Sequence, residues 1–173
     1  MPDPTMATLL EADGKVALRF VRRFAHPPEK VWRAITESEH LAHWMPCDIV
    51  GERRAGAEIE LPFWPAHVKR YGLDMTPVLP GVIKVWDPPA VFEWAWSTDL
   101  LRWELDEVDS GTRLRFTTWL GPDGKGAAST AAGYHVCLDH LIELLDTGTA
   151  PPLVEADPSA LEAQYRALVP GAD

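Results

Sequence analysis

The sequence has 173 residues, of which 16 are Lys or Arg and 26 are Asp or Glu, so its formal net charge is -10. A field of this sign repels nucleic-acid phosphates and anionic lipid head groups, which excludes nucleic acid and membrane surfaces from the expected partners. A domain of this length buries roughly 70% of the surface that its unfolded chain exposes. We therefore expect a single domain over residues 1–173, with its core at about 8–148 and a tail at 149–173.

The two cysteines, Cys47 and Cys137, stand at no spacing typical of a disulfide framework or a zinc site. The first 15 residues have neither the basic segment nor the apolar run of a signal peptide or a membrane span. These features indicate a cytoplasmic protein with free cysteines. We expect a monomer or a homodimer.

The chain opens with a predicted β-hairpin. Extended segments at 8–11 and 15–24 flank Asp13 and Gly14, and this dipeptide favours a tight turn because both central positions need a positive φ. Arg22 shares the apolar face of the second strand. A guanidinium there needs an anion or several acceptors to offset its desolvation, so its partner is either an internal carboxylate or carbonyl or the carboxylate of a ligand.

Two short helices are predicted next. Pro28 fits the first turn of one helix, whose apolar residues recur at helical spacing up to Ile35. Ser38 begins the other helix, Trp44 lies on its apolar face, and Pro46 ends it.

Strands return over 47–63, with a turn at 53–56 and with alternate apolar residues up to Phe63 on one face. The segment 64–80 contains three prolines and no sustained period. Such a pattern is typical of a long loop or lid.

The second half of the chain predicts a meander followed by a long helix. Short links connect four predicted antiparallel strands, at 81–86, 91–97, 100–108 and 112–120. After a polar loop at 121–126, apolar residues at helical spacing predict a helix over 129–145 that begins near Ser129 or Thr130. The proline-rich tail ends in a short predicted helix around Tyr165.

A strand with tryptophans on one face needs a broad apolar partner. Phe92, Trp94 and Trp96 form such a face, and the helix over 129–145 would pack across it. Gly133 costs this helix about 1 kcal/mol relative to alanine, which suggests a close backbone approach or an opening kept free. The order of elements predicts an α+β arrangement with the helices on one face of a curved sheet, and a hollow that binds a small apolar molecule.

Four segments carry a family resemblance: LRFVRRFAHPPEKVWRAITESEHLAHWMP at 18–46, GVIKVWDPPAVFEWAWS at 81–97, GTRLRFT at 111–117 and STAAGYHVCLDHLIELLDTG at 129–148. In this order and spacing they resemble the START-like superfamily called SRPBCC, and within it the domain homologous to the activator of the 90-kDa heat-shock protein's ATPase. The resemblance covers about residues 8–148.

The resemblance implies a helix-grip fold, like that of the birch-pollen allergen, in which a curved antiparallel sheet wraps around a long C-terminal helix. It also implies a cavity between sheet and helix, which members of the superfamily use for lipids, polyketides and other hydrophobic compounds. This sequence departs from the family at Tyr134, where the family usually has tryptophan. A buried tyrosine hydroxyl needs a partner, and a ligand oxygen could supply it.

The candidate ligand-binding residues lie on the expected inner face of the sheet, on the short and long helices and at the cavity mouth: Arg22, Trp44, Phe63, Phe92, Trp94, Trp96, Trp103, Phe116, Thr118, Tyr134, Cys137, Leu138 and Leu141. The aromatic members could instead simply fill the core, as aromatic residues on alternating strands commonly do.

The histidines and Cys137 form no recognisable catalytic or metal site. His40 with His43, and His135 with Asp139, share helix faces, but a zinc site needs three or four ligands and no third stands at a suitable spacing. Solvated helix-surface histidines are the simpler interpretation. A cysteine inside a helix is most often a small apolar filler, and no nucleophile elbow, phosphate loop or dinucleotide fingerprint is present. We therefore expect no catalytic residue, no metal and no cofactor.

The sequence thus predicts binding of a small hydrophobic molecule, lipid-like or polyketide-like, without chemistry of its own. One alternative is a polyketide cyclase-like enzyme in which His135, Tyr134 or His67 acts as acid or base. Another is a co-chaperone that acts through an exposed patch. The eukaryotic activator carries a separate N-terminal domain for which this chain has no room.

Overall fold

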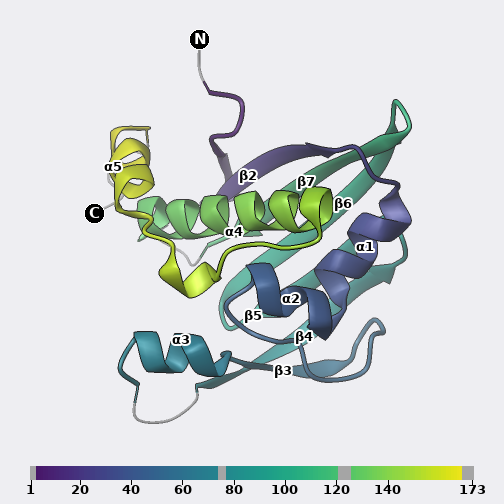
Figure 1. The fold of residues 1–173 in the computed structure, drawn as a ribbon, viewed down its shortest axis with the longest axis horizontal. Coiled ribbons are helices and arrows are strands. Elements are labelled where there is room, and N and C mark those ends of the chain that lie inside the picture. Colours follow the sequence, from purple (N-terminus) through teal and green to yellow (C-terminus); the bar gives the residue numbers. More distant parts are fainter. Residues whose placement is uncertain (1–2, 74–76, 121–125, 169–173) are drawn as a thin grey trace.

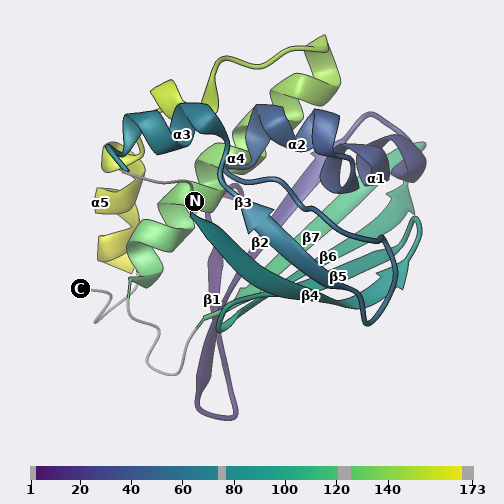
Figure 2. The ribbon, with the colours of Figure 1, turned by 90° about the horizontal axis from the view of Figure 1, so that it is seen from below.

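The computed structural model describes residues 3–73, 77–120 and 126–168. In this part of the chain, one antiparallel sheet has the strand order β1-β2-β7-β6-β5-β4-β3. The helices cover one face of the curved sheet, and the long helix α4 runs across that face (Figures 1 and 2). The predicted helix-grip α+β fold is confirmed. No helix in the described ranges combines the length and the apolarity needed to cross a bilayer.

The elements follow the chain in this order: β1 (Thr8–Ala12), β2 (Lys15–Phe24), α1 (Pro28–Thr36), α2 (Ser38–Trp44), β3 (Glu58–Pro62), α3 (Pro65–Arg70), β4 (Val78–Asp87), β5 (Val91–Trp96), β6 (Asp99–Val108), β7 (Gly111–Trp119), α4 (Ala127–Thr147), η1 (Leu153–Glu155) and α5 (Ser159–Leu168). The predicted opening hairpin is present, and its turn residues Asp13 and Gly14 have φ values of 52° and 74°.

A row of aromatic rings crosses the middle of the concave face. The rings are paired in the sheet register and come from four adjacent strands: Phe20, Phe116, Trp103 and Phe92. Each is buried, and the Trp103 and Phe116 rings stack with centroids 3.9 Å apart. Trp44 of α2 meets Trp103 edge-on at 5.5 Å. Burying such rings is a large source of core stability, so this row joins the sheet to the helical layer.

The prediction of a long loop over 64–80 is wrong, because the segment contains α3 and the first residues of β4. Pro65 occupies the first turn of α3, where its missing N–H costs nothing. Trp64, just before it, donates its indole N–H to the carbonyl oxygen of Met45 at 2.8 Å. The six residues of α3 are too few to show a helical period in the sequence. The hydrogen bond from Trp64 to Met45 instead fixes the start of this helix.

Two other boundaries differ from the prediction. The expected strand from Cys47 is reduced to two isolated bridges, and regular pairing begins only at β3. Helix α4 begins at Ala127 rather than at Ser129 or Thr130, because Gly126 with φ 76° supplies the left-handed turn that precedes it. The rest of the predicted 121–126 loop lies outside the described residues.

The prediction of solvated helix-surface histidines fails at His135, which is only 6% exposed. Helix α5 packs against α4, and its Tyr165 is fully buried there. The Tyr165 hydroxyl accepts a hydrogen bond from the Ala7 backbone N–H at 2.9 Å and lies 2.9 Å from His135 Nδ1. The imidazole also lies close to a carboxylate, since His135 Nε2 is 3.7 Å from Asp139.

We expect Tyr165→Phe to lower the free energy of unfolding by about 1–3 kcal/mol, because it leaves the Ala7 N–H and His135 Nδ1 without a partner. Urea denaturation measures the loss. Tyr71→Phe is the matched control, since the Tyr71 side chain is 59% exposed and should change stability by less than about 0.5 kcal/mol. Equal losses in the two variants would contradict this account.

Burial lowers the pKa of His135 below its ordinary value of 6.5, and Arg22 lowers it further, while Asp139 partly opposes the shift. The unfolded chain therefore binds a proton more readily than the folded chain. The contribution of neutral His135 to the free energy of unfolding should be complete above about pH 6.5. It should decrease as the pH falls below that value. His135→Gln should flatten the decline measured by urea unfolding between pH 7 and pH 5; an unchanged slope would assign the decline to other groups.

Candidate functional site

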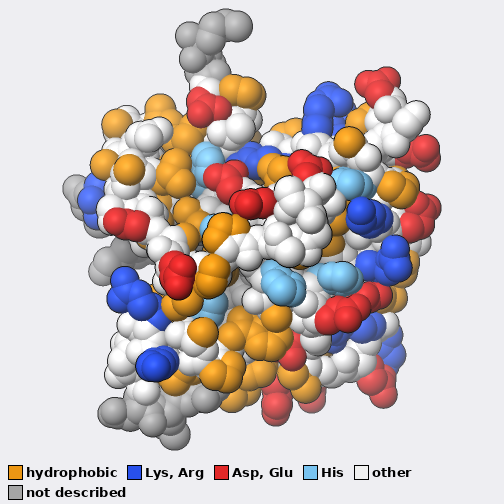
Figure 3. All heavy atoms as spheres, viewed as in Figure 1, with side chains coloured by type: hydrophobic (Ala, Val, Ile, Leu, Met, Phe, Trp, Pro, Cys, Tyr) orange, Lys and Arg blue, Asp and Glu red, His pale blue; other side chains and the backbone are white. Residues whose placement is uncertain are grey.

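A pocket of about 250 Å³ lies where α4, α3, the end of β5 and the C-terminal tail meet. Its lining residues come from five separate parts of the chain: Pro46, His67, Tyr71, Trp96, Thr130, Gly133, Tyr134, Val136, Cys137, Leu153, Ala156 and Pro158. In the space-filling view, hydrophobic side chains gather around α3 and the adjoining edge of β3 (Figure 3).

The first half of α4 forms one wall of the pocket. Thr130, Gly133, Tyr134 and Cys137 follow the spacing of a single helix face. A Cβ atom added to Gly133 would meet no atom within 4 Å, apart from its own chain neighbours and the helix backbone. The missing side chain of Gly133 therefore contributes directly to the open space.

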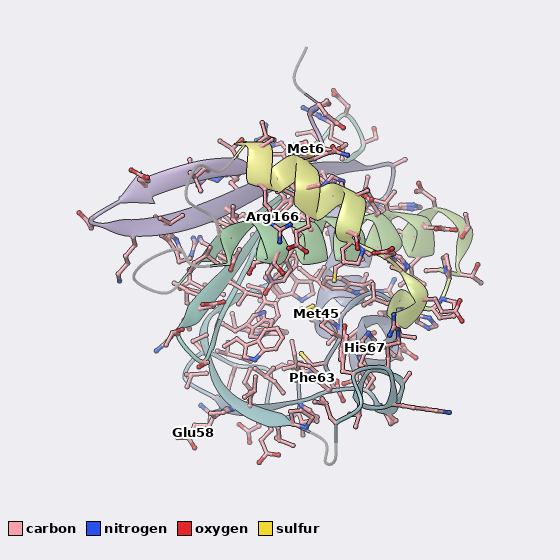
Figure 4. All side chains as sticks on the ribbon, turned by 90° about the vertical axis from the view of Figure 1, so that its left-hand side faces the viewer. Met6, Met45, Glu58, Phe63, His67 and Arg166 are labelled. Atoms are coloured by element: carbon pink, nitrogen blue, oxygen red, sulfur yellow. The ribbon has the colours of Figure 1, made fainter. Side chains whose placement is uncertain are left out.

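Helix α3 forms the opposite wall. The His67 side chain is buried, with 5% of its surface exposed, and its Nδ1 has no hydrogen-bond partner among the described residues. The His67 ring lies 6.1 Å from the ring of Tyr71, which is largely exposed. In Figure 4, His67 lies between α3 and the η1 segment. His67 is thus a buried polar group on an otherwise mostly apolar wall.

The C-terminal tail closes the third side. After α4 the chain turns back alongside this helix to η1 and then to α5 (Figure 1). Leu153, Ala156 and Pro158 of this returning segment line the pocket. The tail that the sequence placed outside the core is therefore part of the site.

Burial favours the neutral forms of three ionisable groups in the pocket, His67, Tyr134 and Cys137. Burial lowers the pKa of His67 below 6.5 and raises the pKa of Tyr134 well above 10.0. Burial also raises the pKa of Cys137 to about 12, so its thiol stays protonated near neutral pH and is a poor nucleophile. The site offers hydrogen bonds and apolar surface rather than charge.

Three of the predicted ligand-binding residues line this pocket: Trp96, Tyr134 and Cys137. Phe63 is next to it, with its ring 6.2 Å from that of Trp96. The other predicted residues, apart from Arg22, lie in the hydrophobic core or beside it and do not line this pocket: Trp44, Phe92, Trp94, Trp103, Phe116, Thr118, Leu138 and Leu141.

Three of these core residues contain polar atoms without partners. Trp94 Nε1, Trp103 Nε1 and Thr118 Oγ1 are buried and make no hydrogen bond within the described residues. A buried polar atom left in this state typically costs about 1–3 kcal/mol. The concave face of the sheet therefore retains donors that an added polar atom would stabilise.

Arg22 lies away from the pocket lining, on the inner face of β2. It is buried, its NH1 donates to the carbonyl oxygen of Val21 at 3.0 Å, and its guanidinium carbon is 5.6 Å from the centre of the Phe20 ring. Of the two alternatives, the internal carbonyl is the partner that the structure provides. The Nε and NH2 atoms of Arg22 have no hydrogen-bond partner among the described residues.

Sequence reasoning did not place the α3 and tail walls at the site, although it named His67 as a possible acid or base. His67 belongs to a helix too short to show a period, and Tyr71 directly follows that helix. Leu153, Ala156 and Pro158 belong to a segment without a regular pattern. The run of small residues at the start of α4 was the one available signal, because it includes Gly133.

One group of possible metal ligands occurs in the described residues, formed by Glu37, Glu39 and His40. Both glutamates are exposed, and His40 Nε2 lies 3.5 Å from Glu37 and 3.6 Å from Glu39. This geometry is that of an ordinary surface ion-pair cluster.

The long helix held by a curved antiparallel sheet defines a helix-grip protein of the SRPBCC type. Residues 25–146 match the family described as Activator of Hsp90 ATPase homolog 1-like protein, and the chain belongs to that family. The predicted resemblance is confirmed. A search of curated proteins gave no significant match.

Solved structures with the same fold share little sequence with this chain. EF2215 from Enterococcus faecalis, titled a conserved protein of unknown function, has a TM-score of 0.74 and 20% identity, over 94% of this chain and 89% of its own. BPP1335 from Bordetella parapertussis has a TM-score of 0.71 and 24% identity, over 98% and 96%. CalU16 from Micromonospora echinospora has a TM-score of 0.65 and 15% identity, over 94% and 92%. At these identities the likeness concerns the fold alone.

Two glycine substitutions test whether the space at Gly133 is open. Gly133→Ala should raise the free energy of unfolding by about 1 kcal/mol, because alanine favours a helix and its methyl group meets no neighbour. Gly81→Ala should lower it by about 1–3 kcal/mol, since the added Cβ would lie 2.6 Å from the carbonyl oxygen of Ala95. Urea unfolding compares the two, and a destabilised Gly133→Ala would show that the site is filled.

Proposed function

We propose that this protein binds a small, largely apolar molecule in the pocket between α4, α3 and the tail, and that it does so without transforming it. The observation that carries the proposal is Gly133, a glycine in a helix interior whose missing side chain opens onto a mostly apolar pocket. A glycine in a helix interior lowers helix stability, so its presence usually has a packing or functional reason. Here that reason is the space that it leaves for a ligand.

A polar atom in the lining supports a ligand with at least one polar group. His67 lines the pocket, and its buried Nδ1 has no hydrogen-bond partner among the described residues. The enzyme alternative receives less support. His135, one of its three candidate bases, lies outside the pocket lining and is already hydrogen-bonded to Tyr165.

Native mass spectrometry of freshly purified protein tests the proposal directly. We expect a population heavier than the apoprotein by the mass of one small molecule, which is released under denaturing conditions. Extraction with an organic solvent followed by refolding should lower the melting temperature, because a ligand present at 100 times its dissociation constant stabilises the native state by roughly 2.7 kcal/mol.

The two buried cysteines provide a matched pair of variants. Cys137 lines the pocket, whereas Cys47 is fully buried in the core and does not line it. Relative to the ligand-free wild type, Cys137→Trp should change the free energy of unfolding by less than about 1 kcal/mol while abolishing the copurified mass, because the indole occupies the open space. Cys47→Trp should cost about 1–3 kcal/mol through overpacking. Retention of the ligand mass by a folded Cys137→Trp variant would place binding elsewhere.

A further inference from the structure

The pocket contains no charged side chain, although the protein as a whole carries a net charge of -10. None of its lining residues is Lys, Arg, Asp or Glu. Burying an ionised carboxylate or ammonium group without a partner costs several kcal/mol. The lining therefore selects against fatty acids, other carboxylates and amines.

Two of the rings in the lining are held in fixed positions by the core. Trp96 stacks on Trp94 with centroids 5.9 Å apart, and Phe63 meets it edge-on. Tyr134 packs edge-on against Phe116 at 4.9 Å. Rings locked in this way present preformed flat surfaces, which favour a planar aromatic partner over a flexible chain that must lose conformational freedom on binding.

His67 is the strongest polar feature of the pocket. It is buried, its Nδ1 has no hydrogen-bond partner among the described residues, and burial lowers its pKa, which keeps the ring neutral near pH 7. A neutral imidazole has one donor nitrogen and one acceptor nitrogen, and one hydroxyl can pair with only one of them. When the ring proton is on Nε2, Nδ1 accepts a hydrogen bond, and an uncharged hydroxyl supplies the donor.

We propose that the pocket selects an uncharged aromatic molecule bearing a hydroxyl group, and that the His67 imidazole hydrogen-bonds to that hydroxyl. This inference rests on the proposed function and specifies the ligand class of the same site. Trp96 and Tyr134 supply the flat apolar surfaces, and His67 determines which polar group is accepted. The neutral lining is the feature that rejects the acid analogue of the same ring system.

Three naphthalenes of similar size separate these contributions. Titration calorimetry at pH 7 should give a dissociation constant for 2-naphthol that is about 2- to 10-fold lower than that for 2-methoxynaphthalene, since the ether cannot donate a hydrogen bond. Naphthalene-2-carboxylate should bind at least about tenfold more weakly than 2-naphthol, because its charge is not compensated.

His67→Phe should remove the preference for 2-naphthol over the methyl ether and leave the affinity for the ether nearly unchanged. Val136→Ala is the control, since it removes apolar contact and should weaken both compounds equally. Should His67→Phe fail to fold, the imidazole nitrogen chemical shifts of the wild-type protein give the answer, because only a direct hydrogen bond moves them with 2-naphthol and not with the ether.

Equal binding of 2-naphthol and its ether, or binding of the carboxylate as tight as that of 2-naphthol, would overturn the inference and leave the proposed function standing. Failure of all three compounds to bind at millimolar concentration would also overturn it. The mass of a copurified molecule decides the proposed function independently, because it requires no assumption about the chemical class.

Discussion

The row of rings formed by Phe20, Phe116, Trp103 and Phe92 is the constraint on which the rest of the structure depends. These residues come from four neighbouring strands, so their packing fixes the curvature and register of the sheet together. Trp44 reaches this row from α2, and Tyr134 reaches it from α4 through Phe116. The two helices are thereby seated on the same aromatic layer.

This layer also determines where space remains. Where Tyr134 of α4 meets Phe116 the rings are in contact, and Phe116 in turn stacks on Trp103 with centroids 3.9 Å apart. One position earlier on the helix, Gly133 has no side chain, and Trp96 is the β5 residue of the pocket lining. The open volume therefore lies beside the aromatic row and not within it, and five separate parts of the chain line it.

The parts of the fold that were predictable are those with a local period or a specific turn. The alternation of β5 and the apolar spacing of α4 repeat along each element, so a short sequence window reveals them. The turn at Asp13 and Gly14 depends only on the backbone conformation of these two residues. Helix α3 and the tail depend instead on contacts with distant parts of the chain, among them the hydrogen bonds of the Trp64 indole and the Tyr165 hydroxyl. No short-range pattern encodes such contacts.

The same distinction applies to the site. Trp96, Tyr134 and Cys137 were identifiable because they lie on elements with clear periodicity, and Gly133 was identifiable as an exception to helix preference. The sequence named His67 only as a possible acid or base of the enzyme alternative, because its burial and its missing partner are properties of the assembled structure.

Ion pairs of the sheet lie on its outer face, whereas the lining of the pocket contains no charged side chain. On the outer face of the sheet, Arg102 contacts Glu93 at 2.9 Å and Arg113 contacts Asp106 at 3.0 Å, and both pairs are partly exposed. Exposed ion pairs of this kind contribute little to stability but keep the surface hydrated. The neutral pocket lies on the opposite face, so a ligand inside it is separated from these charges by the sheet.

The hydrogen bond between Tyr165 and Ala7 joins positions 158 residues apart in the chain. Contacts of such high sequence separation carry a large chain-closure entropy, so this bond forms only in the assembled fold. The Leu153, Ala156 and Pro158 wall of the pocket lies between α4 and α5 in the chain. Because the bond fixes α5 to the segment before β1, this wall is held at both of its ends, and the pocket depends on a contact made by the opposite end of the described chain.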